Sequence, residues 1–126
     1  MICLDTHALV WWTVAPSQLG GAARRAIDRA DRLGVSAICF WEVALLVRKR
    51  RLELGTPFVE WSAAVLSLPR IDALPLTHEI AAAADALAMH DDPADRFIVA
   101  TARHHGASLV TKDRLLIASA LVETIW

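Results

Sequence analysis

The sequence predicts an α/β fold in which a central, mostly parallel sheet of four to five strands is flanked by helices. Short apolar segments alternate with longer segments of helical character, and glycine, proline and aspartate residues mark the boundaries between them. Strands that alternate with helices at this spacing are typical of a parallel sheet covered on both faces. The length of 126 residues indicates one domain, residues 1–126.

Short apolar segments bounded by turn residues are the predicted strands. The first ends in a carboxylate, because ICL is followed directly by Asp5. A later one, ASLVT, ends in Thr111. The predicted strands cover residues 2–5, 35–38, 71–73 and 107–111, with a last strand within 121–125.

The segments between these strands are predicted helices. Arginines and aspartates mark the solvent face of the helix at 22–33, which we expect Gly34 to end. Pro57 suits the first position of a helix, and Thr77 and Asp92 suit N-caps. The predicted helices begin at Ala8 and continue with 22–33, 39–51, 58–68, 78–89, 93–105 and a short helix after Asp113.

The composition indicates an unusually apolar chain. Hydrophobic residues make up 56% of it, against about 45–50% in typical soluble domains. We expect the surplus, with tryptophans such as Trp11 and Trp41, to lie in the core or on a partner surface. No apolar run approaches the roughly 20 residues that span a bilayer, and no secretory signal is recognisable, so we expect a cytoplasmic protein without membrane attachment.

The net charge of −1 excludes polyanion binding through a global positive field, which leaves local clusters. One basic run, residues 48–51, is either a solvated helix end or a nucleic-acid contact. Cys3 and Cys39 lie in apolar segments without metal-ligand spacing, and we interpret them as reduced, buried thiols.

Four acids carry the functional prediction. In open parallel sheets, sites form beyond the carboxyl ends of the strands, and both Asp5 and Asp113 follow predicted strands. Glu42 stands in an apolar helix, ICFWEVALLV, where burial of an unpaired carboxylate would cost several kcal/mol. Asp95 lies in the first turn of a helix, where it either caps the helix or returns to the same sheet edge.

Carboxylates can share one pocket only if a cation neutralises them. An all-oxygen set favours Mg²⁺ or Mn²⁺ over zinc. The acids therefore predict a divalent metal site for metal-assisted hydrolysis of a phosphodiester, in which an activated water attacks phosphorus in line. We expect Asp5 and Asp95 to bind the metal directly, and Glu42 and Asp113 to bind a second ion or position the water. For His7, both a structural and a site role stay open.

Several stretches match one known family in order and spacing. They are LDTHALVWW, SAICFWEVALLV, DPADRFIVATA, LVTKD and a terminal tryptophan. Across essentially its whole length the chain resembles the PIN-domain ribonucleases, specifically the VapC-type toxins of toxin–antitoxin pairs. The resemblance implies a PIN-like three-layer sandwich and a single PIN domain over residues 1–126.

The resemblance also implies activity, site and partners. It implies endonucleolytic cleavage of RNA by an acidic quartet of Asp5, Glu42, Asp95 and Asp113 that binds Mg²⁺ or Mn²⁺. Thr6, Ser36 and Thr111 would be supporting hydroxyls. Members of this family are usually homodimers held inactive by a cognate antitoxin. Two positions depart from the family pattern: Leu46 stands where lysine is frequent, and Asp91 where a basic or neutral residue is frequent, which would make the pocket more negative.

Two alternatives remain open from the sequence. A PIN-like module that binds RNA or protein without cutting would carry the same fold. A phosphoacceptor receiver domain shares the size and the alternation of strands and helices, but it wants an acidic pair after the first strand, where Asp5 stands without an acidic neighbour.

Overall fold

The strands form a single sheet around the first of them. The computed structural model describes residues 1–126. Five strands, all parallel, lie in the order β3-β2-β1-β4-β5, so β1 is central. The strands are β1 (Ile2–Leu4), β2 (Leu33–Ser36), β3 (Ile71–Leu74), β4 (Leu109–Val110) and β5 (Thr124–Ile125). The predicted α/β class with four to five mostly parallel strands is confirmed.

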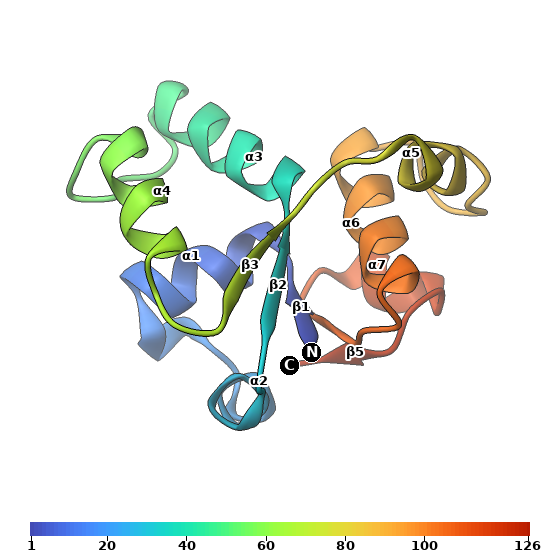
Figure 1. The fold of residues 1–126 in the computed structure, drawn as a ribbon, viewed down its shortest axis with the longest axis horizontal. Coiled ribbons are helices and arrows are strands. Elements are labelled where there is room, and N and C mark those ends of the chain that lie inside the picture. The colour runs from blue at the N-terminus through green and yellow to red at the C-terminus, as the bar shows by residue number, and fades with distance from the viewer.

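Helices cover both faces of the sheet. They are α1 (Thr6–Val14), α2 (Gly21–Arg29), α3 (Ala37–Arg48), α4 (Phe58–Leu66), α5 (His78–Asp85), α6 (Pro93–His104) and α7 (Arg114–Ser119), with a 3₁₀ turn at Pro16–Gln18. Figure 1 shows α1, α3 and α4 on one side of the strands and α5, α6 and α7 on the other. None of these helices combines the length and the apolar composition needed to cross a membrane.

The order of the strands follows from the direction of the crossovers. The chain moves from β1 to β2 and β3 on one side of the sheet, and then crosses to β4 and β5 on the other side. Because parallel crossovers are right-handed, the reversal places the later helices on the opposite face, as Figure 1 shows. A receiver-type sheet has the order 2-1-3-4-5, so the receiver alternative is wrong.

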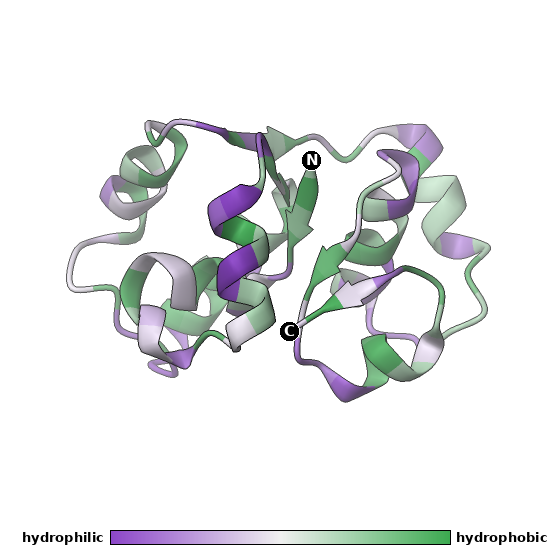
Figure 2. Ribbon diagram, turned by 90° about the horizontal axis from the view of Figure 1, so that it is seen from below, coloured by the Kyte–Doolittle hydropathy of each residue, from purple (hydrophilic) through white to green (hydrophobic).

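The predicted helix at 22–33 is too long. It ends at Arg29, and Leu33 and Gly34 belong to β2. A Cβ on Gly34 would lie 2.7 Å from the Leu74 side chain on β3, so this glycine permits close packing of the sheet and does not end the helix. The amphipathic character of the helix is confirmed: in Figure 2, hydrophilic and hydrophobic residues alternate along α2, which faces the viewer.

Other boundaries shift by a few residues. Pro57 is the N-cap of α4 and not its first residue, whereas Thr77 and Asp92 are N-caps as predicted. α5 ends at Asp85 and not near residue 89, because the Arg96 guanidinium binds the carbonyl oxygens that follow. The carbonyl groups that the guanidinium binds are those of Asp85, Leu87, Met89 and His90.

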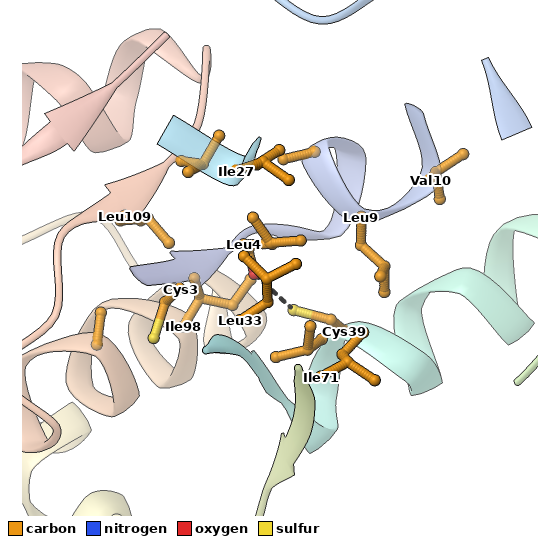
Figure 3. Close-up of a cluster of buried hydrophobic side chains, with 14 of the residues drawn as sticks. Cys3, Leu4, Leu9, Val10, Ile27, Leu33, Cys39, Ile71, Ile98 and Leu109 are labelled. Atoms are coloured by element: carbon orange, nitrogen blue, oxygen red, sulfur yellow. Dashed lines mark hydrogen bonds between the residues drawn. The ribbon is translucent and has the colours of Figure 1, made fainter. Parts of the chain in front are cut away.

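The core lies on both faces of the central strand. Besides a small second cluster of 3 buried residues that joins α5 to α6, its main cluster has 23 buried residues, among which Leu4, Leu9, Leu33 and Leu109 are almost fully enclosed. In Figure 3 these side chains surround β1, and the Cys39 thiol points at the carbonyl oxygen of Leu4. This packing fixes β1, and therefore fixes where the residue after it, Asp5, emerges from the sheet.

Candidate active site

The first and fourth strands end side by side at the point where the strand order reverses. Leu4 pairs with Val110, and the Asp5 backbone N–H donates to the Val110 carbonyl oxygen at 3.1 Å. The next residues, Asp5 and Thr111, are therefore neighbours at the carboxyl edge of the sheet. In open α/β sheets this reversal point is where ligands bind.

Asp5 is a buried carboxylate held by two hydrogen bonds. Its side chain Oδ1 accepts from the Ala8 backbone N–H at 2.7 Å, which caps α1. Its Oδ2 accepts from the Thr111 hydroxyl. Burial raises the pKa of Asp5, the two hydrogen bonds lower it, and the negative charge of Asp113 raises it. The residue is 6% exposed, so the fold holds a costly buried acid in one orientation.

Glu42 is anchored across two helices. The Thr6 hydroxyl at the start of α1 donates to Glu42 Oε1 on α3 at 2.5 Å. Burial raises the pKa of Glu42, and the negative charges of Asp95 and Asp92 raise it further. Glu42 therefore neither points freely to solvent nor pairs with an arginine.

Asp95 binds a histidine and does not cap its helix. Asp92 is the cap, since its Oδ1 accepts from the N–H groups of Ala94 at 3.0 Å and Asp95 at 3.4 Å. The Asp95 carboxylate instead lies 2.7 Å from His90 Nε2. Burial raises the pKa of Asp95, its bond to His90 lowers it, and the charges of Asp92 and Asp113 raise it.

Asp113 begins the helix that follows the fourth strand. Its Oδ1 accepts from the N–H groups of Leu115 at 2.8 Å and Leu116 at 3.1 Å. Its own N–H donates to the Thr111 hydroxyl oxygen at 3.0 Å. Because Thr111 also donates to Asp5, one hydroxyl links the two acids that follow β1 and β4.

The predicted acids are gathered at one edge but lie around two hollows. One, of about 300 Å³, is lined by Asp5, His7, Trp11, Lys112 and Asp113. The other, of about 520 Å³, is lined by Ile38, Trp41, Glu42, Leu45, Asp92, Pro93 and Ala94. Asp95 lines neither, yet its charge acts on Glu42 and its pKa responds to Asp113. In this conformation no three His, Cys, Asp or Glu side chains are grouped closely enough to hold a metal ion.

The donor set nonetheless fits a hard divalent cation. Glu42, Asp95 and Asp113 each use one carboxylate oxygen in the hydrogen bonds above and leave the other without a protein partner. No lysine or arginine forms an ion pair with any of the four acids. Desolvated, mutually repelling carboxylates with free oxygens are the ligands that Mg²⁺ and Mn²⁺ prefer.

Two of the three predicted supporting hydroxyls bond to site acids. Thr6 binds Glu42 and Thr111 binds Asp5. Ser36 is buried at the end of β2 and accepts a hydrogen bond from the Thr101 hydroxyl on α6 at 3.4 Å. It joins the sheet to a helix and bonds to none of the four acids.

The sequence interpretation missed residues that contact or flank the acids. His90 had no recognisable signal except its position five residues before Asp95. Asp92 was recognised only as a cap, although its charge acts on both Glu42 and Asp95. Lys112 and Trp126 lie far apart in sequence, and only the pairing of β4 with β5 brings them together.

The departures at Leu46 and Asp91 lie outside both hollows. Leu46 is half-buried on α3. Asp91 is exposed and lines a separate hollow with Asp85 and Arg96. The basic run begins at Arg48, the last residue of α3, roughly 9 Å beyond Glu42 along the helix axis.

Fold, strand order and acidic edge together define an α/β domain of the nuclease type. Residues 2–120 match the PIN domain family, and the chain belongs to this family. It is 41% identical over 117 residues to Ribonuclease VapC22 of Mycobacterium tuberculosis, a match that covers 91% of this chain and 88% of the relative. The chain is thus a homologue of VapC ribonucleases, members of a family that typically uses divalent metals.

Solved structures agree on the fold. Mycobacterium tuberculosis VapC20, a toxin that cleaves the Sarcin-Ricin loop, superposes with a TM-score of 0.73 at 19% identity, and the match covers 100% of both chains. VapBC2 from Rickettsia felis, bound to a promoter DNA fragment, superposes with a TM-score of 0.69 at 16% identity over 98% of this chain and 97% of that chain.

Proposed function

We propose that the chain is a metal-dependent endoribonuclease, the toxin of a VapBC-type toxin–antitoxin pair, which hydrolyses phosphodiester bonds in RNA. The observation that carries this proposal is the set of desolvated carboxylates at the reversal point of the sheet, without a lysine or arginine partner. Homology to Ribonuclease VapC22 supports it.

Asp5, Glu42, Asp95 and Asp113 would hold Mg²⁺ or Mn²⁺. When bound, the cation supplies positive charge that offsets these acids and polarises the scissile phosphodiester. The protein contributes fixed orientation: Thr111 holds Asp5, and Thr6 holds Glu42. His90 holds one oxygen of Asp95 and leaves the other free. Such partners of ligating groups typically change metal affinity or activity by about 10–100-fold.

The direct test is cleavage of RNA by the purified chain. Total cellular RNA is incubated with and without Mg²⁺ or Mn²⁺, and new ends are mapped. We expect new ends only with metal. Asp5→Asn keeps the size of the side chain and an acceptor for the Ala8 N–H, so it should fold and lose cleavage. Undiminished cleavage by Asp5→Asn would exclude the proposed site.

The non-catalytic alternative has one observation in its favour, because no three of the metal-binding side chain types are grouped closely here. Calorimetric titration with Mn²⁺ separates the two functions. A nuclease site that closes around the ion should bind at millimolar metal or below. Absence of binding at that concentration, together with absence of cleavage, would favour the module that binds without cutting.

We also propose a cognate antitoxin and a homodimer as partners. Exposed apolar side chains support a partner surface, among them Val59 at 74%, Leu115 at 59% and Trp41 at 54% exposure. Light scattering on a sizing column gives the mass of the protein alone and with the product of a short reading frame directly upstream. A monomer at micromolar concentration would exclude the homodimer, and absence of a complex would exclude that product as antitoxin.

A further inference from the structure

One side of the hollow that contains Asp5 and Asp113 is not acidic. His7, Trp11 and Lys112 line it with the two acids. The rings of His7 and Trp11 lie 5.3 Å apart between centroids, tilted by 45°. His7 is exposed, whereas Trp11 is half-buried against the core. The hollow therefore has an aromatic wall beside its acidic one.

A lysine in the lining of the hollow is held over the aromatic rings. Lys112 Nζ lies 4.5 Å from the Trp11 ring centroid and 5.8 Å from that of Trp126. Lys112 lies between Thr111 and Asp113 in sequence but forms no ion pair with an acid. Cation–π contacts thus direct this ammonium toward the aromatic wall, and those of its N–H groups that do not face the rings stay available to an anion.

The C-terminal tryptophan is itself fixed in place. Its residue follows β5, and its ring packs edge-on against Trp11 with centroids 5.5 Å apart. At Gly20, before α2, an added Cβ would lie 2.8 Å from both the backbone and the indole of Trp126. Gly20 has an ordinary φ of −62°, so the position needs glycine for space and not for conformation.

We propose that His7, Trp11 and Lys112 form a binding subsite for a single ribonucleotide next to the acids, where the base stacks on the His7–Trp11 wall and Lys112 binds a phosphate. This inference rests on the proposed nuclease function and specifies how that site holds its substrate. A hollow of about 300 Å³ is at the lower end of small-ligand pockets. The aromatic wall would hold the base of one unpaired nucleotide, Lys112 would bind its phosphate, and the scissile bond would lie next to the acids.

The test uses the tryptophan indole N–H signals in NMR spectra of the whole chain. The protein is first saturated with Mg²⁺, so that shifts caused by metal are recorded separately. Adenosine 5′-monophosphate, ribose 5-phosphate and inorganic phosphate are then titrated in turn. We expect the nucleotide to move the Trp11 and Trp126 signals and to leave buried Trp61 unchanged. A shift confined to Trp41, in the other hollow, would overturn the proposal.

Two substitutions separate base from phosphate. His7→Ala should weaken binding of the nucleotide by about fivefold or more, the range for loss of one stacking contact. The affinity for ribose 5-phosphate should not change. His7→Phe should restore nucleotide binding. Lys112→Gln should weaken binding of both the nucleotide and ribose 5-phosphate. Both residues are exposed, so these variants should fold. Equal nucleotide binding by His7→Ala and the parent would overturn base stacking.

A third substitution tests the placement of Lys112 from a distance. Gly20→Ala lies outside the hollow but must displace Trp126. It should shift the Trp126 signal and that of Trp11, whose ring packs against Trp126, and weaken binding of both ligands, while the Trp41 and Trp61 signals keep their positions. Unchanged affinity for both ligands would overturn the role given to Trp126.

The subsite and the nuclease function can fail separately. Cleavage of RNA by a protein whose Trp11 signal ignores the nucleotide would overturn the subsite and keep the function. Nucleotide binding at Trp11 without RNA cleavage in Mg²⁺ or Mn²⁺ would keep the subsite and overturn the function. If these rings instead serve only to contact a protein partner, the Trp11 and Trp126 signals should respond to none of the three ligands. That result would also overturn the subsite.

Discussion

At the scale of single residues, three of the four site carboxylates use one oxygen for folding and leave the other for binding, whereas Asp5 uses both oxygens in hydrogen bonds. Asp113 caps α7 with one oxygen, Glu42 accepts from Thr6 with one, and Asp95 meets His90 with one. The second oxygen of each is left without a protein partner. Burial and mutual repulsion raise the pKa of Asp5, Glu42 and Asp95, so the metal-free site holds charge at a cost to stability.

This cost predicts how stability depends on pH. The folded pKa values of Asp5, Glu42 and Asp95 lie above their unfolded values, so the folded state keeps protons that the unfolded state has lost. In EDTA, the free energy of unfolding should therefore fall as the pH rises from about 4 through the folded pKa values. Urea denaturation at a series of pH values measures it.

The matched control removes two of these three charges without changing side-chain size. The double variant Asp5→Asn/Glu42→Gln should be more stable than the parent near neutral pH in EDTA, with a flatter pH dependence. Excess Mg²⁺ or Mn²⁺ should stabilise the parent and leave the double variant unchanged. A parent whose stability rises between pH 4 and 7 in EDTA would contradict the assignment of raised pKa values.

At the scale of elements, the segment between α5 and α6 is organised by one arginine. Arg96 donates to four carbonyl groups, those of Asp85, Leu87, Met89 and His90, at 2.9–3.4 Å. These bonds end α5 and hold the segment that carries His90. The arginine in the DPADR motif therefore supports the site through the backbone and not by contact with the acids.

Arg96→Gln should loosen this segment. We expect faster amide hydrogen exchange over residues 86–91, a loss of stability of about 1–3 kcal/mol from the unpaired carbonyls, and weaker metal binding because His90 no longer orients Asp95. Arg103→Gln, on the same helix and without a hydrogen bond or ion pair of its side chain in the structure, is the control. Equal exchange rates in the two variants would contradict the role of Arg96.

The N-cap of α6 provides a second prediction at this scale. Asp92→Ala should lose about 1 kcal/mol of stability, the usual effect of removing a cap. Asp92→Asn keeps a capping oxygen and removes a charge that acts on Glu42 and Asp95, so it should retain or exceed the parent stability. Asp91→Ala removes the same charge from a residue that caps nothing. Equal stability of Asp92→Ala and Asp91→Ala in denaturant titrations would contradict the role of Asp92 as the cap.

At the scale of the whole molecule, the two thiols lie in the core that supports the site. Burial raises the pKa of Cys3 to about 11 and raises the pKa of Cys39 further. Cys3 belongs to β1, the strand that leads to Asp5, and Figure 3 shows Cys39 beside that strand. Thiolates are the reactive form of cysteine, so neither thiol should react while the sheet is closed.

Ellman's reagent tests this enclosure. At pH 8 we expect no reactive thiol in the native protein and two in guanidinium, matching the two cysteines of the sequence. Any slow labelling of the native protein should proceed through unfolding. Its rate should follow the unfolding equilibrium where refolding outpaces labelling, and the unfolding rate where it does not. Gly34→Ala, whose added Cβ crowds the ends of the Leu74, Met1 and Cys3 side chains, should accelerate this labelling. Rapid labelling of the native parent would contradict the closed core.

The sequence alone determined the features that depend on local pattern. Alternating apolar and helical segments predicted the parallel α/β class, and cap residues such as Thr77 and Asp92 predicted where helices begin. Acids that follow β1 and β4 could be placed at one sheet edge because parallel strands end together. The spacing of the motifs was enough to identify the family. The prediction that Gly34 ends a helix was wrong, because glycine serves both to end helices and to allow close packing, and Gly34 lies within β2.

Only the tertiary structure decided which side chains meet. Thr6 reaches Glu42 across 36 residues and Thr111 reaches Asp5 across 106, while Ser36 turns to Thr101. The cation–π contacts of Lys112 depend on β5 lying beside β4. A local pattern sets the backbone of one segment, but hydrogen bonds and charge interactions act over a few ångströms in space. Their partners are therefore fixed by packing around β1 and not by position along the chain.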